Sequence, residues 1–287
     1  MNEAQFIAAL RGLPLHPGAQ DLRDDAAVIE IGGEALVLTH DAIAEDVHYR
    51  AGTDPFDIAW KLVAVNLSDL AAKGAEPIGV LIGAALVEHA ERFVEGLAAV
   101  LGEYQVPLLG GDTIRPNGPA SFGCTAIGRA TARPVPRRSG ARPGDALYVT
   151  GQIGAAMLGF RAGDGEAYLR PRPRLAEGRA LAPLAHAMMD VSDGLLLDAA
   201  RMAEASGCTA LLDSAAIPFA PALAPGDRDA ALRWGDDYEL LFAIAPDATL
   251  PVAATRIGSM QAPGDAALLL DGEAPAGSLG YQHGSLR

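Results

Sequence analysis

Seven aspartates of this chain lie at the ends of apolar segments, or beside them, instead of being scattered over polar ones. They are Asp25, Asp41, Asp69, Asp112, Asp190, Asp193 and Asp236. Each alone is more often structural: Asp193 could cap the helix that follows it, and Asp41 could be a turn residue. The repeated placement favours carboxylates that converge on one place and bind hard divalent cations through oxygen. Because Mg²⁺ usually takes one or two carboxylates together with waters and phosphates, a group of this size predicts several Mg²⁺ ions on a polyphosphate.

Asp25 directly follows Asp24, and the pair precedes the apolar run "AAVIEI". Adjacent carboxylates repel each other, and burying them is costly unless a positive charge lies nearby. Solvated turn residues are one explanation of the pair. The chain has only two lysines, Lys61 and Lys73. The alternative is therefore that a bound metal ion supplies the charge, with Asp25 as its ligand and Asp24 as a support.

Histidines and arginines offer further candidate contacts. His48 in "EDVHY" could contact a substrate, although a histidine beside valine and tyrosine is more often structural. His40 could ligate a metal or only continue its strand. Arginine's planar guanidinium suits phosphate oxygens, and the candidates are Arg137, Arg138, Arg170, Arg172 and Arg174. Solvated loop arginines explain them equally well.

The bulk properties restrict the class of protein. The chain has 287 residues, 50% of them hydrophobic, and a formal net charge of −14. Nucleic acids and membrane surfaces would repel it, so neither is an expected partner. The longest apolar stretch, residues 77–87, is shorter than a membrane helix of roughly 20 residues, and the first residues lack an export-signal pattern. Cys124 and Cys208 form no disulfide framework, and a cytoplasmic location is expected.

The common phosphate-binding and nucleophile motifs are absent from the sequence. There is no G-x-x-x-x-G-K-[ST] loop, no G-x-G-x-x-G fingerprint, no G-x-S-x-G elbow and no H-E-x-x-H helix. If this acidic protein handles phosphates, bound metal ions and a few arginines must supply most of the positive charge.

Apolar periodicity places these candidates on alternating strands and helices. After a short N-terminal helix we expect a long helix that is capped by Asp54, has Pro55 in its first turn and ends at Gly74. Its expected buried stripe is Phe56, Trp60, Val63, Leu67 and Leu70. The other expected elements are strands over 26–31, 34–42, 78–87 and 121–128, a helix over about 90–104 and a loop at "LLGGDT", residues 108–113.

Residues 129–145 are rich in proline, glycine and arginine and have no apolar period, which is typical of a domain junction. Beyond them strands and helices alternate again. Expected strands are 146–151, 187–191, 209–213 and 238–245, and expected helices include 153–160, 194–206 and 229–234. The sequence thus predicts two α/β domains, at 1–137 and 138–287.

A series of motifs follows a fixed order along the chain. They are "RDDAAV", "THDAIAEDVHY", "AVNLSDLAAKGAEP", "LLGGDT", "RSGARPGDALYVTG", "RPRPR", "MDVSDGLLLD", "GDDYELLF" and "GYQHG", from about Asp21 to His283. Together they resemble the thiamine-monophosphate kinases of the aminoimidazole ribonucleotide synthetase-like superfamily. "VNLSDLAAKGAEP" and "DVSDGL" are shared widely in that superfamily, whereas the combination with "DVHY", "GDDYELLF" and the terminal aromatic is more specific to the thiamine enzymes.

The resemblance implies a fold, an activity and a set of site residues. It implies an N-terminal α/β domain that forms a homodimer through its sheet, a C-terminal α/β domain, and a cleft between them for ATP and several Mg²⁺ ions. The implied reaction converts ATP and thiamine monophosphate into ADP and thiamine diphosphate. The implied magnesium ligands are Asp25, Thr39, His40, Asp41, Asp69, Asp112, Asp190 and Asp193, of which Asp25, Asp69, Asp112 and Asp190 are expected to be catalytic. Implied nucleotide contacts are Gly111, Asp112, Arg138 and Ser192, and implied substrate contacts are His48, Asp236 and Tyr281.

Some residues depart from the family's pattern. Lys73 replaces a frequent methionine, His40 replaces a common threonine, and Asp236 replaces a usual glutamate, which shortens its reach by one methylene. None of these changes removes an expected metal ligand, so an active enzyme is expected. Two alternatives remain: another ATP-using member of the superfamily, of the ring-closing synthetase or hydrogenase-maturation type, and a relative that binds nucleotide or metal without turnover.

The expected chemistry needs no strong general base. The nucleophile is an oxygen of the substrate's own monophosphate, which is mostly ionised at neutral pH. The obstacle is the repulsion between two anionic phosphates, which divalent cations reduce. We therefore expect direct in-line transfer without a phosphoenzyme.

Overall fold

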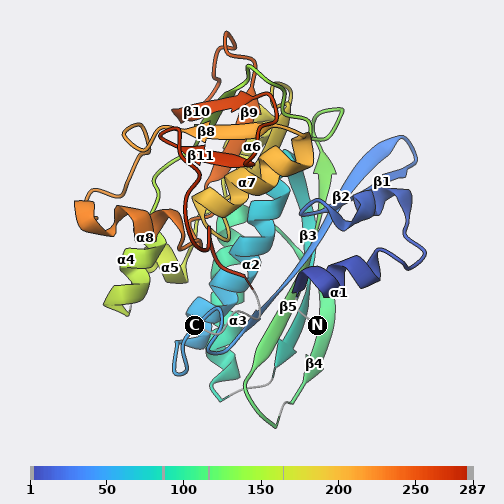
Figure 1. The fold of residues 1–287 in the computed structure, drawn as a ribbon. Helices are drawn as coiled ribbons and strands as arrows, with labels where there is room; N and C mark the ends of the chain where they lie inside the picture. Colours follow the sequence, from blue (N-terminus) through green and yellow to red (C-terminus); the bar gives the residue numbers. More distant parts are fainter. Residues whose placement is uncertain (1–2, 86–87, 116, 164, 283–287) are drawn as a thin grey trace.

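Two β-sheets, one from each half of the chain, form the framework of the computed structural model, which describes residues 3–85, 88–115, 117–163 and 165–282. Helix α2 (Pro55–Ala72) runs between them (Figure 1). Strands and helices in both halves confirm the predicted α/β class. His283, where the motif series ends, and residues 86–87 of one expected strand lie outside the described residues. No helix among the described residues is long and apolar enough to cross a membrane.

The N-terminal sheet has the strand order β1-β2-β5-β3-β4. Its strands are β1 (Ala27–Ile31), β2 (Glu34–Ala44), β3 (Ala75–Ala85), β4 (Leu108–Ile114) and β5 (Ser121–Ala130). Neighbouring strands are antiparallel except β3 and β4, which are parallel. Helix α1 (Glu3–Leu10) and a 3-10 segment (Pro17–Leu22) precede β1, and α3 (Ala90–Tyr104) packs along α2. Strands β1, β2, β3 and β5 and helix α3 confirm the expected elements.

Strand β4 shows that the prediction of a loop at "LLGGDT" is wrong. Gly111 pairs with Ile82 of β3, and a Cβ atom on Gly111 would lie 1.9 Å from the Ile82 carbonyl oxygen. Only glycine fits where the two backbones come this close. The glycine that suggested a loop therefore permits the strand pairing.

Helix α2 has the predicted boundaries. Of its predicted buried stripe, Val63, Leu67 and Leu70 are buried and Phe56 and Trp60 are half-buried, and other sides of the helix are buried as well. The Asp54 carboxylate accepts the Phe56 N–H at 2.9 Å and caps the first turn. Every residue from Lys61 to Ala72 is buried, the polar ones included. The reason is that α2 packs against β2, β3 and β5 and also against α6 (Leu175–Leu181) and β7 (Ala187–Asp190) of the other half.

The C-terminal sheet has the strand order β11-β8-β10-β6-β9-β7. Its strands are β6 (Ala146–Val149), β7 (Ala187–Asp190), β8 (Thr209–Leu212), β9 (Leu240–Ile244), β10 (Thr255–Gln261) and β11 (Leu268–Leu270). The helices are α4 (Ala155–Ala162), α5 (Glu166–Leu169), α6 (Leu175–Leu181), α7 (Leu195–Ser206), the 3-10 turn Pro225–Asp227 and α8 (Arg228–Leu232). Strands β6 to β9 and helices α4, α7 and α8 confirm the prediction, whereas β10 and β11 were not expected.

One hydrophobic core joins the two halves. Met188, Leu240 and Phe242 of the C-terminal sheet belong to the core that surrounds α2. Their neighbours Met189 and Leu241 belong to the core under α7, as the alternation of side chains along a strand requires. After β5 ends at Ala130, the expected junction contains no further helix or strand before β6. The domain division at 137/138 stays a prediction.

Candidate active site

A cavity of about 1350 Å³, here called the large cavity, gathers acidic residues from both halves of the chain. Its lining includes Asp24, Asp25, Asp41, Asp69, Arg138, Asp190, Ser192 and Asp193. Asp41 comes from β2, Asp69 from α2 and Asp190 from the last position of β7. Helix α2 and the strands on either side of it therefore bring these carboxylates together.

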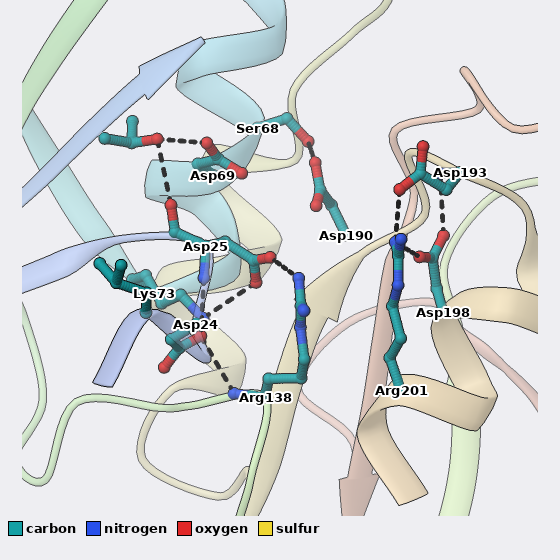
Figure 2. A network of polar contacts seen from close by, with 12 residues as sticks. Asp24, Asp25, Ser68, Asp69, Lys73, Arg138, Asp190, Asp193, Asp198 and Arg201 are labelled. Atoms are coloured by element: carbon teal, nitrogen blue, oxygen red, sulfur yellow. Dashed lines mark hydrogen bonds and ion pairs between the residues drawn. The ribbon is translucent and has the colours of Figure 1, made fainter. Parts of the chain in front are cut away.

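Two cations of the chain itself hold Asp24 and Asp25 (Figure 2). The Lys73 ammonium contacts both carboxylates, that of Asp25 at 3.3 Å. Arg138 contacts the Asp25 carboxylate through its guanidinium and donates its backbone N–H to Asp24 at 3.2 Å. Burial tends to raise the pKa of Asp25, but Arg138 and Lys73 outweigh burial and lower this pKa to about 2. Asp25 is therefore ionised at neutral pH.

The expectation that the positive charge at this pair comes from a bound metal is wrong for the protein alone. Lys73 follows Asp69 by four residues, so it lies on the same side of the helix end, one turn further on. Its side chain is fully buried against the two carboxylates. Lys73 and Asp24 are 49 residues apart, and for that reason their contact could not be predicted from local sequence patterns.

Asp69 and Asp190 are buried carboxylates whose side-chain partners are hydroxyl groups (Figure 2). The Thr39 hydroxyl contacts the Asp69 carboxylate, and the Ser68 hydroxyl donates to Asp190 at 2.5 Å. Burial, with added repulsion from neighbouring aspartates, raises the pKa of Asp69 well above its usual range. Burial, and then the charge of Asp25, raises the pKa of Asp190 to about 7. This wall of the large cavity therefore favours a bound cation.

The donor set suits Mg²⁺ ions that are shared with bound phosphate. Among the residues that the structure describes, no group of three or more His, Cys, Asp or Glu side chains could hold an ion by itself. Mg²⁺ commonly takes one or two carboxylates and completes its shell with waters and phosphates. The buried Oδ2 atom of Asp24 has no hydrogen-bond partner. Carboxylate oxygens lie along one wall of the large cavity, and their negative charge is not fully balanced. Such oxygens suit Mg²⁺ ions of this kind.

A second cavity of about 210 Å³, here called the small cavity, adjoins the large one. Both cavities are lined by Asp41, Ser192, Asp193 and Tyr238. The small cavity is also lined by His48, Phe160, Tyr168, Trp234, Asp236 and Tyr281. Aromatic rings with a few polar groups suit a flat heterocycle, because the rings stack on it and the polar groups orient it.

The two aspartates of "GDDYELLF", Asp236 and Asp237, have different surroundings and different roles in the structure. Asp236 lines the small cavity from a backbone with φ of 60°, which is uncommon for a residue with a side chain. Asp237 accepts the N–H groups of Gly154 at 3.0 Å and Ala156 at 3.4 Å, and so caps the start of α4. Burial raises the pKa of Asp237 to about 8. This loop thus connects the cavity wall to the helix that carries Phe160.

Lys61 is a candidate that reasoning from the sequence missed. Its side chain is 1% exposed, and its ammonium lies 3.2 Å from Asp236 Oδ1 and donates to the His48 carbonyl oxygen at 3.0 Å. A lysine inside the apolar run "AWKLVAV" was the available signal, since lysine is almost never buried unless it is paired.

Four predicted residues, Thr39, His40, Gly111 and Asp112, line neither cavity, although the Thr39 hydroxyl contacts Asp69 of the large one. The His40 ring contacts the Thr125 hydroxyl at 2.8 Å, and strand alternation places it on the opposite face of β2 from Thr39. Gly111 and Asp112 lie on the exposed strand β4. Their roles as magnesium or nucleotide contacts stay predictions.

Asp193 lines both cavities but does not cap α7 with its side chain. The Arg201 guanidinium contacts the Asp193 carboxylate (Figure 2). Asp198 instead accepts the N–H groups of Asp193 and Gly194, both at 3.1 Å. The helix N-terminus is therefore satisfied by a residue inside the helix.

Most of the arginines considered for phosphate contacts form ion pairs with carboxylates of the chain itself. Arg170 pairs with Asp57 at 2.6 Å, and Arg174 pairs with Glu239 at 2.5 Å. Of the five candidates, Arg138 lines the large cavity.

Comparisons with known proteins identify the family. The models for the N-terminal and C-terminal domains of AIR synthase related proteins match residues 23–130 and 142–255. A thiamine-monophosphate kinase from Salmonella typhimurium is 36% identical over 264 residues, which cover 84% of this chain and 80% of the relative. The crystal structure of thiamine-monophosphate kinase from Stenotrophomonas maltophilia K279a is 36% identical, with a TM-score of 0.77, and the match covers 94% of this chain and 96% of that one. The structure of AaThiL complexed with AMPPCP and TMP has a TM-score of 0.85 at 26% identity, and the match covers 98% of this chain and 97% of that one. The chain therefore belongs to the thiamine-monophosphate kinase family, among the AIR synthase related proteins.

Proposed function

We propose that this protein transfers the terminal phosphoryl group of ATP to the phosphate of thiamine monophosphate, giving ADP and thiamine diphosphate. The observation that carries the proposal is the junction of two cavities at the acidic residues. The large cavity has room for a nucleotide, and the small one has the rings and polar groups that suit a heterocycle. The relative that holds AMPPCP and TMP supports the same pair of ligands.

The residues divide between the two substrates. The triphosphate of ATP lies along the acidic wall of the large cavity, near Arg138 and Ser192. The thiamine portion lies in the small cavity, near His48, Asp236 and Tyr281. Because the cavities share Ser192 and Asp193, the two reacting phosphates meet there.

Several Mg²⁺ ions bound by Asp25, Asp41, Asp69 and Asp190 would neutralise the phosphate charges. The chain's own contribution is to hold those carboxylates together and keep Asp25 ionised through Lys73 and Arg138. Since a phosphate oxygen of the substrate is the nucleophile, no side chain has to remove a proton from it. Transfer is direct and in line, and no phosphoenzyme forms.

His48 is the proposed histidine contact to the substrate, from the wall of the small cavity. Its Nδ1 atom accepts the Ala44 N–H at 3.1 Å, so in the neutral ring the proton is on Nε2. The His48 carbonyl oxygen accepts from Lys61 and from the Tyr168 hydroxyl, which holds the segment that carries the ring.

The activity is tested by incubating the chain with ATP, Mg²⁺ and thiamine monophosphate and following the products by phosphorus NMR. We expect thiamine diphosphate and ADP in equal amounts. Binding of both substrates without turnover would identify a non-catalytic relative. Consumption of ATP without thiamine diphosphate would point to another reaction of the superfamily.

Asp69→Asn tests the acidic wall in the same assay. It should lower turnover by about two orders of magnitude or more, because one oxygen ligand loses its charge. Asp57→Asn is the matched control, since Asp57 lies on the same helix but pairs with Arg170 and lines neither cavity. Near wild-type turnover of Asp69→Asn at saturating Mg²⁺ would contradict the assignment.

We also propose that two copies associate through the N-terminal sheet. Leu81 of β3 and Leu108, Leu109 and Ile114 of the edge strand β4 are between 38% and 56% exposed. Exposed large apolar side chains on an edge strand and its neighbour are typical of an interface. Light scattering should give twice the mass of one chain, and Leu108→Lys should shift the protein to the monomer. A wild-type protein that is monomeric at all accessible concentrations would contradict this proposal.

A further inference from the structure

Lys61 is a buried cation directly behind the small cavity. Its ammonium donates to the His48 carbonyl oxygen at 3.0 Å, lies 3.2 Å from Asp236 Oδ1, and stands 3.7 Å from the centre of the Tyr168 ring. His48, Asp236 and Tyr168 all line the small cavity, whereas Lys61 does not. Lys61 therefore touches several parts of the wall without facing the space that the wall encloses.

The contacts of Lys61 connect segments that are distant in the sequence. Lys61 is on α2, His48 follows β2, Tyr168 is on α5, and Asp236 precedes β9. The Tyr168 hydroxyl donates to the same His48 carbonyl at 2.7 Å. Two elements of the C-terminal half are thus tied to the N-terminal half at one ammonium group.

The contacts also orient the Asp236 carboxylate. Lys61 and the Tyr238 hydroxyl, the latter at 3.1 Å, both approach Oδ1. The carboxylate that lines the small cavity is therefore held at one oxygen by two donors. Asp236 has a φ of 60°, and such a backbone persists only where surrounding contacts hold it.

We propose that Lys61 is a positioning residue for thiamine monophosphate: it holds Asp236 and the His48 segment in the arrangement that binds the thiamine portion. This inference rests on the proposed function. It assigns to Lys61 no contact with the substrate and no part in phosphoryl transfer. Charge-assisted hydrogen bonds are the stronger class, so loss of the ammonium should weaken substrate binding about 10- to 100-fold.

The test is calorimetric titration of Lys61→Met with thiamine monophosphate and, separately, with ATP and Mg²⁺. Methionine keeps the length and apolar stem of lysine, and Asp236 keeps the Tyr238 hydroxyl as a partner. We expect the Kd for thiamine monophosphate to rise about 10- to 100-fold, with the Kd for ATP changed by less than about threefold. In steady-state kinetics, the KM for thiamine monophosphate should likewise rise much more than the KM for ATP.

Lys73→Met is the matched control, because Lys73 is the other buried lysine of the same helix region and contacts Asp24 and Asp25 in the large cavity. We expect it to change the binding of ATP and Mg²⁺ and to leave the Kd for thiamine monophosphate nearly unchanged. If both lysine variants weaken the binding of thiamine monophosphate and of ATP equally, the effect is a general loss of structure and the inference is overturned.

A double variant decides whether Lys61 acts through Asp236. Asp236→Asn alone should weaken thiamine monophosphate binding, and adding Lys61→Met should weaken it by much less than it does in the wild-type background. If each substitution raises the Kd for thiamine monophosphate by the same factor with and without the other, the positioning role is overturned. If Lys61→Met does not fold, as judged by circular dichroism, Lys61→Gln replaces it in the same cycle, since its amide is a donor without charge.

The outcomes separate this inference from the function on which it rests. A wild-type protein that binds thiamine monophosphate no better than Lys61→Met does would overturn the inference alone. A wild-type protein that binds none of this substrate would overturn the proposed function, and the inference with it.

Discussion

Replacement of Asp190 by asparagine should stabilise the metal-free protein at neutral and alkaline pH, although it removes a proposed magnesium ligand. Asp190 is 3% exposed, and burial together with the charge of Asp25 raises its pKa from 3.8 to about 7. Between these two values the unfolded chain has ionised Asp190 while the folded chain has kept it protonated. Folding then takes up a proton, so the free energy of unfolding decreases as the pH rises from about 4 to about 7. Above pH 7 this loss is complete and constant.

The magnitude follows from the size of the pKa shift. Each unit corresponds to about 1.4 kcal/mol, so the ionised Asp190 costs the folded protein about 4 kcal/mol at pH 8. Asparagine carries no charge and its Oδ1 atom can still accept from the Ser68 hydroxyl, which now donates to Asp190 at 2.5 Å. The difference between Asp190→Asn and wild type should therefore be near zero at pH 4 and rise to about 4 kcal/mol in favour of the variant at pH 8.

The assay is urea unfolding in the presence of EDTA from pH 4 to pH 8, followed by tryptophan fluorescence. Asp247→Asn is the control for removing one negative charge, since Asp247 is exposed and its substitution should cause only a small change at every pH. Saturating Mg²⁺ and ATP should reverse the order of stability, because wild type then gains the ligands that its carboxylate binds. An Asp190→Asn protein that is no more stable than wild type at pH 8 in EDTA would refute the argument from burial and repulsion.

Three further perturbations test other parts of the site. Tyr281→Ala should raise the KM for thiamine monophosphate more than the KM for ATP, because Tyr281 lines the small cavity; equal changes would mean that the ring only packs. Gly235→Ala should lower the free energy of unfolding by about 1–3 kcal/mol, since Gly235 has φ of 86° and a Cβ atom there would lie 2.3 Å from the Ser192 carbonyl oxygen; an unchanged urea midpoint would contradict this. Removal of Mg²⁺ with EDTA should abolish turnover while the far-ultraviolet circular dichroism stays the same, because backbone pairing in the two sheets and a hydrophobic core that joins them hold the fold; a loss of ellipticity would show that the ion also supports the fold.

Features that depend on neighbouring residues were predictable from the sequence. The start of α2 at Pro55 follows from the Asp54 cap, and its end follows from Gly74, because caps and helix-breaking residues act within one turn. The hairpin of β1 and β2 likewise follows from apolar strands on either side of Gly32 and Gly33. The motifs that indicated the family are of the same kind, since each is a short run of adjacent residues.

Strand β4 marks the limit of that reasoning. The glycines of "LLGGDT" are locally consistent with a loop, and only the approach of β3 shows that Gly111 belongs to a strand. The sequence also predicted a single buried stripe on α2, because it could not show that the C-terminal half covers the opposite side of that helix.

The sequence by itself determined which residues could do the chemistry: a set of carboxylates, a histidine and aromatic residues in a recognisable order. Only the tertiary structure decided how the charges are balanced. The Asp25 carboxylate forms ion pairs with Lys73 and Arg138, and the Asp236 carboxylate forms one with Lys61. The carboxylates of Asp69 and Asp190 contact hydroxyl groups instead. Electrostatic interactions depend on distance in space and on burial, and these partners come from segments that are distant in the sequence. For that reason two neighbouring aspartates, or two lysines of one helix region, acquire different roles that their local sequence does not show.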